Sequence, residues 1–326
     1  MPDAGLSGEA VVAHRIPYRL PLRRPWRWAG GEMNERCGTL LRLETPDGYV
    51  GWGDIAPFPA VAIGPDQALA HADQCARLDI AAQRAGVPLA AWLGGGAAPP
   101  AVAVNAALGD LAGISPEAVQ TACELGFDIL KIKVGRGAPA EEITRLGELA
   151  ARLPAGVGLR LDANRSWDEA AARRFLDACR DLPVESLEEP LRRPTLAALG
   201  TLQESVPFPL SLDESLADFF AADCLAGAAV RRLVIKPARQ GGLLASLELA
   251  RRARDAGVEC VVTSALESTC GLLAAAHLAA VIAPAAAHGL ATADWFAADT
   301  GTPPPVTAGR LFLSDRPGLG FHPRLS

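Results

Sequence analysis

The sequence predicts an α/β fold in which a (β/α)8-type barrel follows a smaller α+β module. From residue 101 onward, short apolar runs alternate with stretches of helical periodicity, an order that indicates parallel strands joined by helices. There are eight such runs, which is the number of strands in a closed barrel. Charged residues close several runs at intervals of about 25 residues, close to the length of one strand–helix unit. A doubly wound sheet is the alternative, and it would place those residues in a row rather than a ring.

Composition excludes several classes of protein. The chain has 326 residues, of which 50% are hydrophobic and 21% charged, so it can bury a large core. The net charge is −6 and the basic residues are scattered, so we expect no nucleic-acid partner. Apolar stretches are interrupted before they reach membrane-spanning length, and the first ten residues lack the pattern of a secretion signal. The 7 cysteines form no C-x-x-C pair, which favours small buried side chains in a reducing cytoplasm over a zinc site.

The N-terminal part of the chain is mainly β. We expect a first strand at Glu9–His14 and a hairpin from Gly38–Glu44 and Tyr49–Asp54, which flank the turn Thr45–Gly48. The intervening Arg24–Glu35 is rich in Trp, Gly and Arg without a clear period, and we interpret it as a mobile loop.

Two helices and a flexible exit follow the β segment. Helical spacing covers Pro65–Ala85 and, after a Gly-Val-Pro stop, the short Leu89–Leu93. Three glycines and the segment Ala97–Pro100 then indicate a boundary between modules. We therefore predict an N-terminal α+β domain over 1–99, a barrel over 100–300, and a tail over 301–326 that returns to the N-terminal domain.

The barrel region supplies the remaining elements. We expect strands at Ala101–Ala107, Ile129–Val134, Val157–Asp162, Val184–Glu188, Leu210–Asp213, Leu233–Lys236, Val258–Ser264 and, weakly, His288–Thr292. We expect helices at Pro116–Leu125, Ala140–Leu153, Trp167–Asp181, Thr195–Glu204, Asp218–Ala226, Leu243–Ala256 and Thr269–Ala280.

The second barrel run carries two lysines, Lys131 and Lys133, that point to the same side of a buried strand. Two ammonium groups on one buried face need partners. Active sites of parallel barrels lie at the carboxyl ends of the strands. We expect both lysines to converge there with the residues that close the later runs, namely Asp162, Glu188, Asp213 and Lys236.

Three carboxylates on successive strand ends repel one another and need a cation. Hard oxygen ligands suit Mg²⁺ or Mn²⁺. Three separate ion pairs or helix caps are the alternative, and Asp213 before Glu214-Ser215 has the sequence of a cap. The coincidence of all three acids at matching positions favours the metal.

Lys236 lies on the sixth predicted strand, across the barrel mouth from Lys131 and Lys133. A lysine beside a dication and other cations gives up its proton more readily and can act as a base. A metal beside it can stabilise the enediolate left when a proton next to a carboxylate is removed. This pattern predicts proton abstraction from a small-molecule carboxylate. The lysines could instead be counter-ions of the acids, which would not explain their opposed placement.

Five motifs close the strands in order, Lys131-Ile132-Lys133, Leu161-Asp162-Ala163-Asn164, Glu188-Glu189-Pro190, Asp213-Glu214-Ser215 and Ile235-Lys236-Pro237. With the N-terminal segment Gly51–Pro57, they resemble the muconate-lactonizing branch of the enolase superfamily over nearly the whole chain. The segments Arg160–Trp167, Thr263–Ser268 and His288–Thr292 are similar to the o-succinylbenzoate synthase family of menaquinone biosynthesis.

This resemblance implies a modified (β/α)7β barrel with a capping domain built from the N-terminal region and the C-terminal tail. It implies a lyase that dehydrates 2-succinyl-6-hydroxy-2,4-cyclohexadiene-1-carboxylate to o-succinylbenzoate. Lys133 would be the base, Lys236 would stabilise the enediolate, and Lys131 would hold charge beside Lys133. Asp162, Glu188 and Asp213 would bind Mg²⁺, with Mn²⁺ as a substitute. The implied substrate-binding residues are Arg160, Asn164, Ser264 and Gly289.

Three other functions remain open, as does the oligomeric state. A racemase of N-acylamino acids or an epimerase of dipeptides in the same superfamily would also use opposed lysines. A Schiff-base aldolase and an inactive binding barrel are alternatives of other classes. One departure from the family pattern bears on substrate choice, because Ala60–Gly64 passes straight into the helix at Pro65 and a capping helix is missing.

Overall fold

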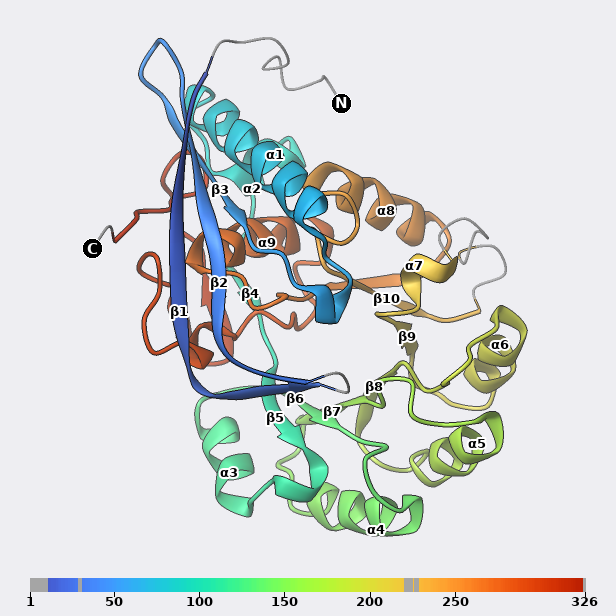
Figure 1. The fold of residues 1–326 in the computed structure, drawn as a ribbon. Coiled ribbons are helices and arrows are strands. Elements are labelled where there is room, and N and C mark those ends of the chain that lie inside the picture. Colours follow the sequence, from blue (N-terminus) through green and yellow to red (C-terminus); the bar gives the residue numbers. More distant parts are fainter. Residues whose placement is uncertain (1–10, 29–30, 220–224, 226–228, 325–326) are drawn as a thin grey trace.

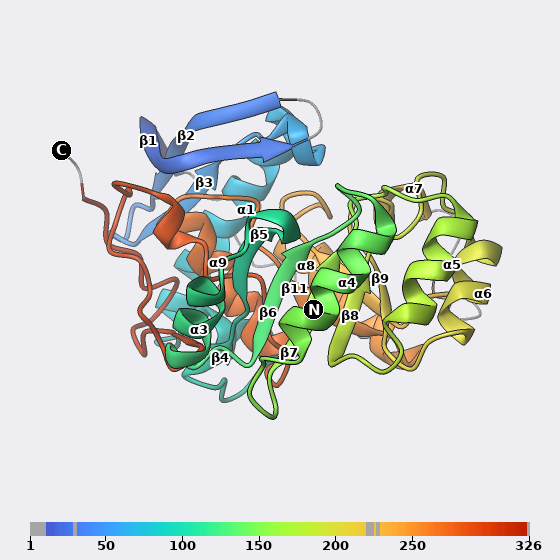
Figure 2. The same cartoon turned by 90° about the horizontal axis from the view of Figure 1, so that it is seen from below.

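The computed structural model describes residues 11–28, 31–219, 225 and 229–324. A three-stranded antiparallel sheet with one long helix lies beside a parallel sheet that curls into a barrel (Figures 1 and 2). This arrangement confirms the predicted α/β barrel fold.

The N-terminal sheet has the order β1 (Val12–Trp28), β2 (Gly31–Glu44), β3 (Val50–Ile55). The β2–β3 hairpin turns at Pro46–Gly48 as predicted, with Gly48 at a φ of 87° that favours glycine. The expected first strand is present but longer, because β1 continues to Trp28. Glu9 and Ala10 lie outside the described residues.

The prediction of a mobile loop at Arg24–Glu35 is wrong, because the described residues 24–28 and 31–35 belong to the strands β1 and β2. Trp26 pairs with Met33, and the register shifts between Pro21 and Trp26. Proline is tolerated on an edge strand where no ladder hydrogen bond is needed. The carbonyl of Pro21 faces away from β2, since it accepts a hydrogen bond from the backbone N–H of Ala297 at 2.8 Å. The prolines and the register shift hide the strand period in the sequence.

Helix α1 (Pro65–Arg84) covers this sheet and is followed by α2 (Leu89–Gly94), both as predicted. Gly51 and Gly53 permit close packing, because a Cβ at either position would lie 2.0 Å from the carbonyl oxygen of Ala76 or Ala72. In the described part of the chain, only the 3₁₀ turn Pro59–Val61 lies between β3 and α1.

The barrel contains a seven-stranded parallel sheet in sequence order. Its strands are β5 (Ala106–Asp110), β6 (Ile129–Lys133), β7 (Gly158–Asp162), β8 (Val184–Glu188), β9 (Leu210–Leu212), β10 (Arg232–Ile235) and β11 (Glu259–Val262). The eighth position is filled by single bridges, Thr263 to Gly289 and Val104 to His288. The weak run at His288–Thr292 therefore closes the ring without forming a regular strand. The first run is divided between β4 (Ala101–Ala103) and β5.

Helices connect the barrel strands close to their expected positions. They are α3 (Pro116–Glu124), α4 (Pro139–Ala150), α5 (Glu169–Ala178), α6 (Leu196–Glu204), α7 (Leu216–Phe219), α8 (Leu243–Asp255) and α9 (Thr269–Ile282), with 3₁₀ turns at Leu111–Gly113 and Ala293–Trp295. Of the helix expected at Asp218–Ala226, only the first two residues fall in α7, and most of the rest lie outside the described residues. No helix in the described ranges is both long and apolar enough to cross a membrane.

The C-terminal segment first joins the barrel and then reaches the N-terminal module. Strands β12 (Val306–Thr307) and β13 (Arg310–Phe312) form a sheet with β4 rather than with β1–β3. Further on, the backbone N–H of Leu319 donates to Asp79 of α1 at 2.7 Å. The ring of Phe321 packs edge-on against Trp52 of β3, with 5.5 Å between ring centroids.

Two buried side chains fix the N-terminal sheet to the barrel. The guanidinium of Arg36 donates to the carbonyls of Ala56 and Pro57 and, from the barrel side, to that of Leu266. The carboxylate of Asp54 accepts from the N–H and hydroxyl of Ser268, both at 2.8 Å. Burial raises the pKa of Asp54 to about 6, which shows how closed this junction is to water.

His277 joins three parts of the fold and provides a test of the packing. It is 1% exposed on α9; its Nδ1 accepts from Ala90 N of α2, and its Nε2–H donates to Leu319 O. Burial lowers the pKa of His277 to about 4 from 6.5. The unfolded chain therefore takes up a proton first as the pH falls, and folded stability is lost between pH 6.5 and 4.

We predict that the stability difference between wild type and His277→Gln shrinks by about 2 kcal/mol between pH 7.5 and pH 5. Guanidinium unfolding at both pH values measures this difference. His14→Gln, at an exposed position on β1, is the matched control. A difference that does not change with pH would contradict the buried neutral imidazole.

Candidate active site

The six charged residues predicted to converge all lie at the carboxyl end of the barrel sheet. Lys131 and Lys133 are on β6, while Asp162 and Glu188 end β7 and β8. Asp213 follows β9 directly, and Lys236 follows β10. Parallel strands in register bring these ends to one edge of the sheet, so residues distant in sequence become neighbours.

Lys131 connects two of the acids. Its Nζ lies 3.0 Å from Asp162 Oδ2 and 2.5 Å from Glu188 Oε2. Burial alone would lower the pKa of Lys131, but the nearby carboxylates, which also include Asp213, outweigh burial and raise it. Lys131 is therefore a permanent cation that balances the acids.

Asp213 is held by two cations. The ammonium of Lys236 bonds both of its carboxylate oxygens. Arg239 Nη2 lies 2.5 Å from Asp213 Oδ1 and 2.6 Å from the backbone oxygen of Asp213. Burial opposes ionisation, but Lys236 and Arg239 outweigh it and hold the pKa of Asp213 below its usual range.

Sequence reasoning did not identify Arg239. Its position three residues after Lys236 is the one feature of the sequence that points to it. In the structure these residues form a turn, in which Arg239 N donates to Lys236 O at 2.9 Å. That turn returns the guanidinium to the end of the sheet.

Lys133 differs from the other two lysines. In the described part of the chain, no ion pair or hydrogen bond joins it to an acid, and its Nζ lies 5.2 Å from the ring centroid of Trp26. Trp26 comes from the β1–β2 hairpin, the end of which reaches the barrel beside β6 (Figure 1). The Trp26 ring packs edge-on against Trp295 at 5.0 Å, and the guanidinium of Arg24 lies 3.9 Å from the Trp295 centroid. The Trp26 ring, itself packed against Trp295, therefore lies beside Lys133, for which the described residues supply no acid partner.

Two further acids surround Asp213. Glu189 accepts from the N–H groups of Asp213 and Ser215 at 2.6 and 2.8 Å and from the Ser215 hydroxyl at 2.6 Å. Glu214 accepts from Asn164 Nδ2 at 3.0 Å. Burial, then the nearby carboxylates, raises the pKa of Glu214 to about 8. Asn164, one of the predicted substrate-binding residues, thus lies among the acids.

The donor set is suited to a hard cation. One oxygen of Glu188 and one of Glu214 are buried without a hydrogen-bond partner. Burial first, and then Asp162 and Asp213, raise the pKa of Glu188 despite the opposing charge of Lys131. As the side chains stand, no three acids, histidines or cysteines in the described ranges surround a common point. Lys131 and Lys236 lie against these acids, and carboxylate oxygens are the ligands that Mg²⁺ prefers in proteins.

Arg160, predicted to bind substrate, is buried among polar partners. It is 0% exposed, and its guanidinium is held by Glu185 at 3.1 Å, Asn105 at 3.3 Å and the carbonyl of Ala287 at 2.9 Å. It lies two residues before Asp162 on β7, so both side chains point to the same face and Arg160 lies deeper in the barrel. The side chain balances Glu185 inside the barrel, and its role in substrate binding stays a prediction.

Ser264 and Gly289 lie at the closure of the ring. The Ser264 hydroxyl donates to Glu267 at 2.9 Å and accepts from Leu266 N at 2.9 Å. Gly289 forms a β-bridge with Thr263. A Cβ added at Gly289 would lie 2.7 Å from the methyl group of Thr263. Both residues shape the loop after β11.

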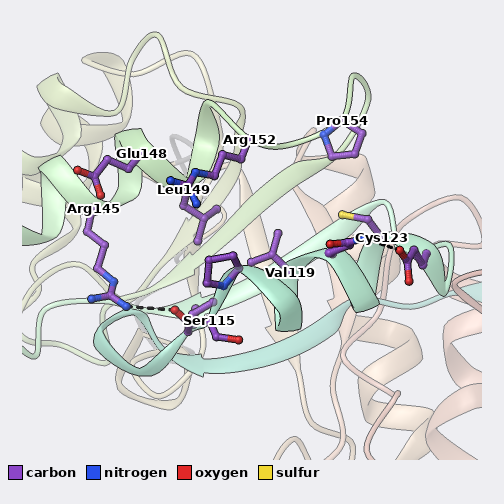
Figure 3. Close-up of a pocket in the computed structure, with 12 residues that line it drawn as sticks. Ser115, Val119, Cys123, Arg145, Glu148, Leu149, Arg152 and Pro154 are labelled. Carbon is purple, nitrogen blue, oxygen red and sulfur yellow. Dashed lines mark hydrogen bonds between the residues drawn. The ribbon is translucent and has the colours of Figure 1, made fainter.

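A groove of about 770 Å³ lies elsewhere, between α3 and α4 on the outer wall of the barrel (Figure 3). Val119 and Cys123 of α3 line one side, and Leu149 of α4 lines the other. Arg145 of α4 spans it to donate to Ile114 O at 3.1 Å. None of the six predicted active-site residues lines this groove.

Comparison with known proteins agrees with the fold and the motifs. A family model described as enolase C-terminal domain-like matches residues 115–325. The o-succinylbenzoate synthase of Thermosynechococcus vestitus is 33% identical over 306 residues, covering 85% of this chain and 91% of the relative. The L-Ala-D/L-Glu epimerase of Bacillus subtilis is 30% identical over 311 residues, covering 80% and 82%.

A solved dipeptide epimerase from Cytophaga hutchinsonii, in complex with Mg and the dipeptide D-Ala-L-Val, has the same fold. It superimposes with a TM-score of 0.82 at 24% identity, covering 96% of this chain and 95% of that chain. The chain described here belongs to the enolase superfamily, in its muconate-lactonizing subgroup.

Proposed function

We propose that this protein catalyses Mg²⁺-dependent removal of a proton next to a carboxylate. The proposed reaction is dehydration of 2-succinyl-6-hydroxy-2,4-cyclohexadiene-1-carboxylate to o-succinylbenzoate, a carbon–oxygen lyase reaction. The observation that carries the proposal is the arrangement of three acids on successive strand ends between Lys133 on β6 and Lys236 after β10. The resemblance to o-succinylbenzoate synthase supports the choice of substrate.

The residues divide the work by their electrostatic surroundings. Asp162, Glu188 and Asp213 would hold Mg²⁺, which when bound supplies positive charge to the enediolate oxygens. Lys133 has no acid partner in the described structure, so it suits a base that accepts the α-proton and then assists the departure of hydroxide. Lys131 remains protonated among the acids and contributes charge.

Lys236 has the complementary task on the other side of the site. It bonds Asp213 and is buried, so it can hold an ammonium charge against the enediolate. For dehydration, a stable charge is sufficient at this position. Aromatisation of the product drives the reaction, so few further contacts are required.

A racemase or epimerase is the second candidate, because lysines on opposite sides also suit two-base chemistry. The similarity to an L-Ala-D/L-Glu epimerase supports this alternative at comparable identity. A Schiff-base aldolase would have to use Lys133, since Lys131 and Lys236 are engaged in ion pairs with acids.

We predict that the purified protein forms o-succinylbenzoate from the cyclohexadiene precursor, and that EDTA abolishes turnover until excess Mg²⁺ is added. The appearance of the aromatic product in the ultraviolet measures the rate. Parallel reactions with N-succinylamino acids and L-Ala-D/L-Glu in D₂O measure deuterium exchange at the α-carbon. Exchange or epimerisation without dehydration would reject the proposed reaction in favour of the second candidate.

We predict that Lys133→Ala lowers kcat by a factor of about 10² to 10⁴, because it removes the proposed base. Mg²⁺ affinity, measured by calorimetry, should stay within about twofold, since Lys133 contacts none of the acids. Lys131→Ala is the matched comparison on the same strand and should alter Mg²⁺ affinity. Wild-type turnover in Lys133→Ala would disprove the role of Lys133.

We also propose that residues 1–99 cap the site, with Trp26 as the contact to Lys133. Trp26→Ala should raise KM about five- to tenfold with a smaller change in kcat, because it opens the cover over the site. Trp26→Phe keeps a ring over the ammonium and should behave more like the wild type. Equal KM values for all three proteins would contradict a capping role for the hairpin.

A further inference from the structure

The loop that follows β6 encloses a carboxylate. The buried side chain of Glu142, 8% exposed, accepts hydrogen bonds from three consecutive backbone N–H groups. Gly135 N donates to Oε2 at 2.8 Å, and Arg136 N and Gly137 N donate to Oε1 at 3.0 and 3.1 Å. Successive N–H groups turned to one side form an anion-binding concavity. Here the anion is supplied by the first turns of α4.

Both partners of this contact are fixed by the fold. Gly135 has a φ of 76°, and a Cβ there would lie 2.6 Å from the Cβ of Ser166, so the loop conformation depends on glycine. Helix α4 is held by the fully buried Leu146 and by Arg145, which donates to Ile114 O across the groove in Figure 3. Glu142 therefore reaches the loop from a rigid wall.

The loop bears directly on the proposed site. It begins two residues after Lys133, and Val134 N donates to Asp162 O at 2.9 Å. It also carries Arg136 to the ends of the neighbouring strands. Arg136 Nη2 lies 3.4 Å from Asn164 Oδ1, and its Nε lies 3.8 Å from Asp110 Oδ1.

We propose that Glu142 is a positioning residue of the active site. Its carboxylate fills the anion-binding loop 135–137 and thereby fixes the end of β6 that carries Lys133, together with Arg136 at the barrel mouth. The proposal rests on the role proposed above for Lys133. The Glu142 carboxylate holds the loop by accepting from its N–H groups. A small carboxylate from solution should therefore be able to take the place of this side chain.

The test is chemical rescue of Glu142→Ala. We expect kcat to fall about tenfold or more, since small displacements at a reacting group are costly. Formate or acetate should restore activity with saturation, whereas chloride at equal ionic strength should not. Glu142→Gln, which fills the space but retains one acceptor oxygen, should be impaired without rescue. Glu141→Ala, at the adjacent exposed position, is the matched control and should show neither loss nor rescue.

A second readout separates this inference from the proposed reaction. Backbone hydrogen exchange at residues 135–137 should be slow in the wild type, fast in Glu142→Ala and slow again with acetate. Acetate-insensitive exchange, or wild-type turnover in Glu142→Ala, would overturn the positioning role. If the wild type dehydrates nothing, the proposed function fails, and the exchange experiment still decides whether the carboxylate holds the loop.

Discussion

The structure depends most on the need to balance a dense group of buried acids at one end of a parallel sheet. Asp162, Glu188, Glu189, Asp213 and Glu214 lie on or just after three neighbouring strands. Burial raises the pKa of Glu188, Glu189 and Glu214. Lys131, Lys236 and Arg239 supply the nearest positive charge, and each contacts an acid directly. Two carboxylate oxygens still lack partners. The three predicted ligands are ion-paired in the described structure, and the unpartnered oxygens beside them support the proposed metal site.

The rest of the barrel keeps these charges in place through contacts made deeper inside or further along the chain. Both carboxylate oxygens of Glu189 accept hydrogen bonds, from the N–H groups of Asp213 and Ser215 and from the Ser215 hydroxyl. Glu189 thereby fixes the backbone of Asp213, a proposed metal ligand. Beneath the site, the guanidinium of Arg160 balances Glu185. A polar layer under the acids therefore replaces the hydrophobic filling expected of a barrel interior.

The sequence predicted those parts of the fold that follow from hydrophobic periodicity and from the alternation of side chains along a strand. Strand ends, and hence the gathering of Lys131, Asp162 and Glu188, follow from apolar runs that close on a charged residue. The β1–β2 hairpin did not, because its prolines and its register shift hide the strand period in the sequence. The contacts of Arg239 and Glu142 depend on the backbone turns after β10 and β6. No sequence pattern in those turns predicts their conformation. For Arg160, the alternation of side chains along β7 predicted the face to which it points. It did not predict how deep in the barrel the side chain is buried.

Depth along a strand also explains how two lysines on β6 can have different tasks. In the sheet register Lys131 is level with Arg160, and Lys133 is level with Asp162. Two residues along a strand separate them by about 7 Å. The deeper Lys131 rises among the carboxylates and is held protonated by them. Lys133 begins at the level of the acids and extends past them toward the indole of Trp26. One strand thus presents Lys131 to the acids and Lys133 to the ring of Trp26 in the hairpin. Because the acids belong to the barrel and Trp26 to the N-terminal sheet, a substitution in the sheet can alter the proposed cover without altering the acids.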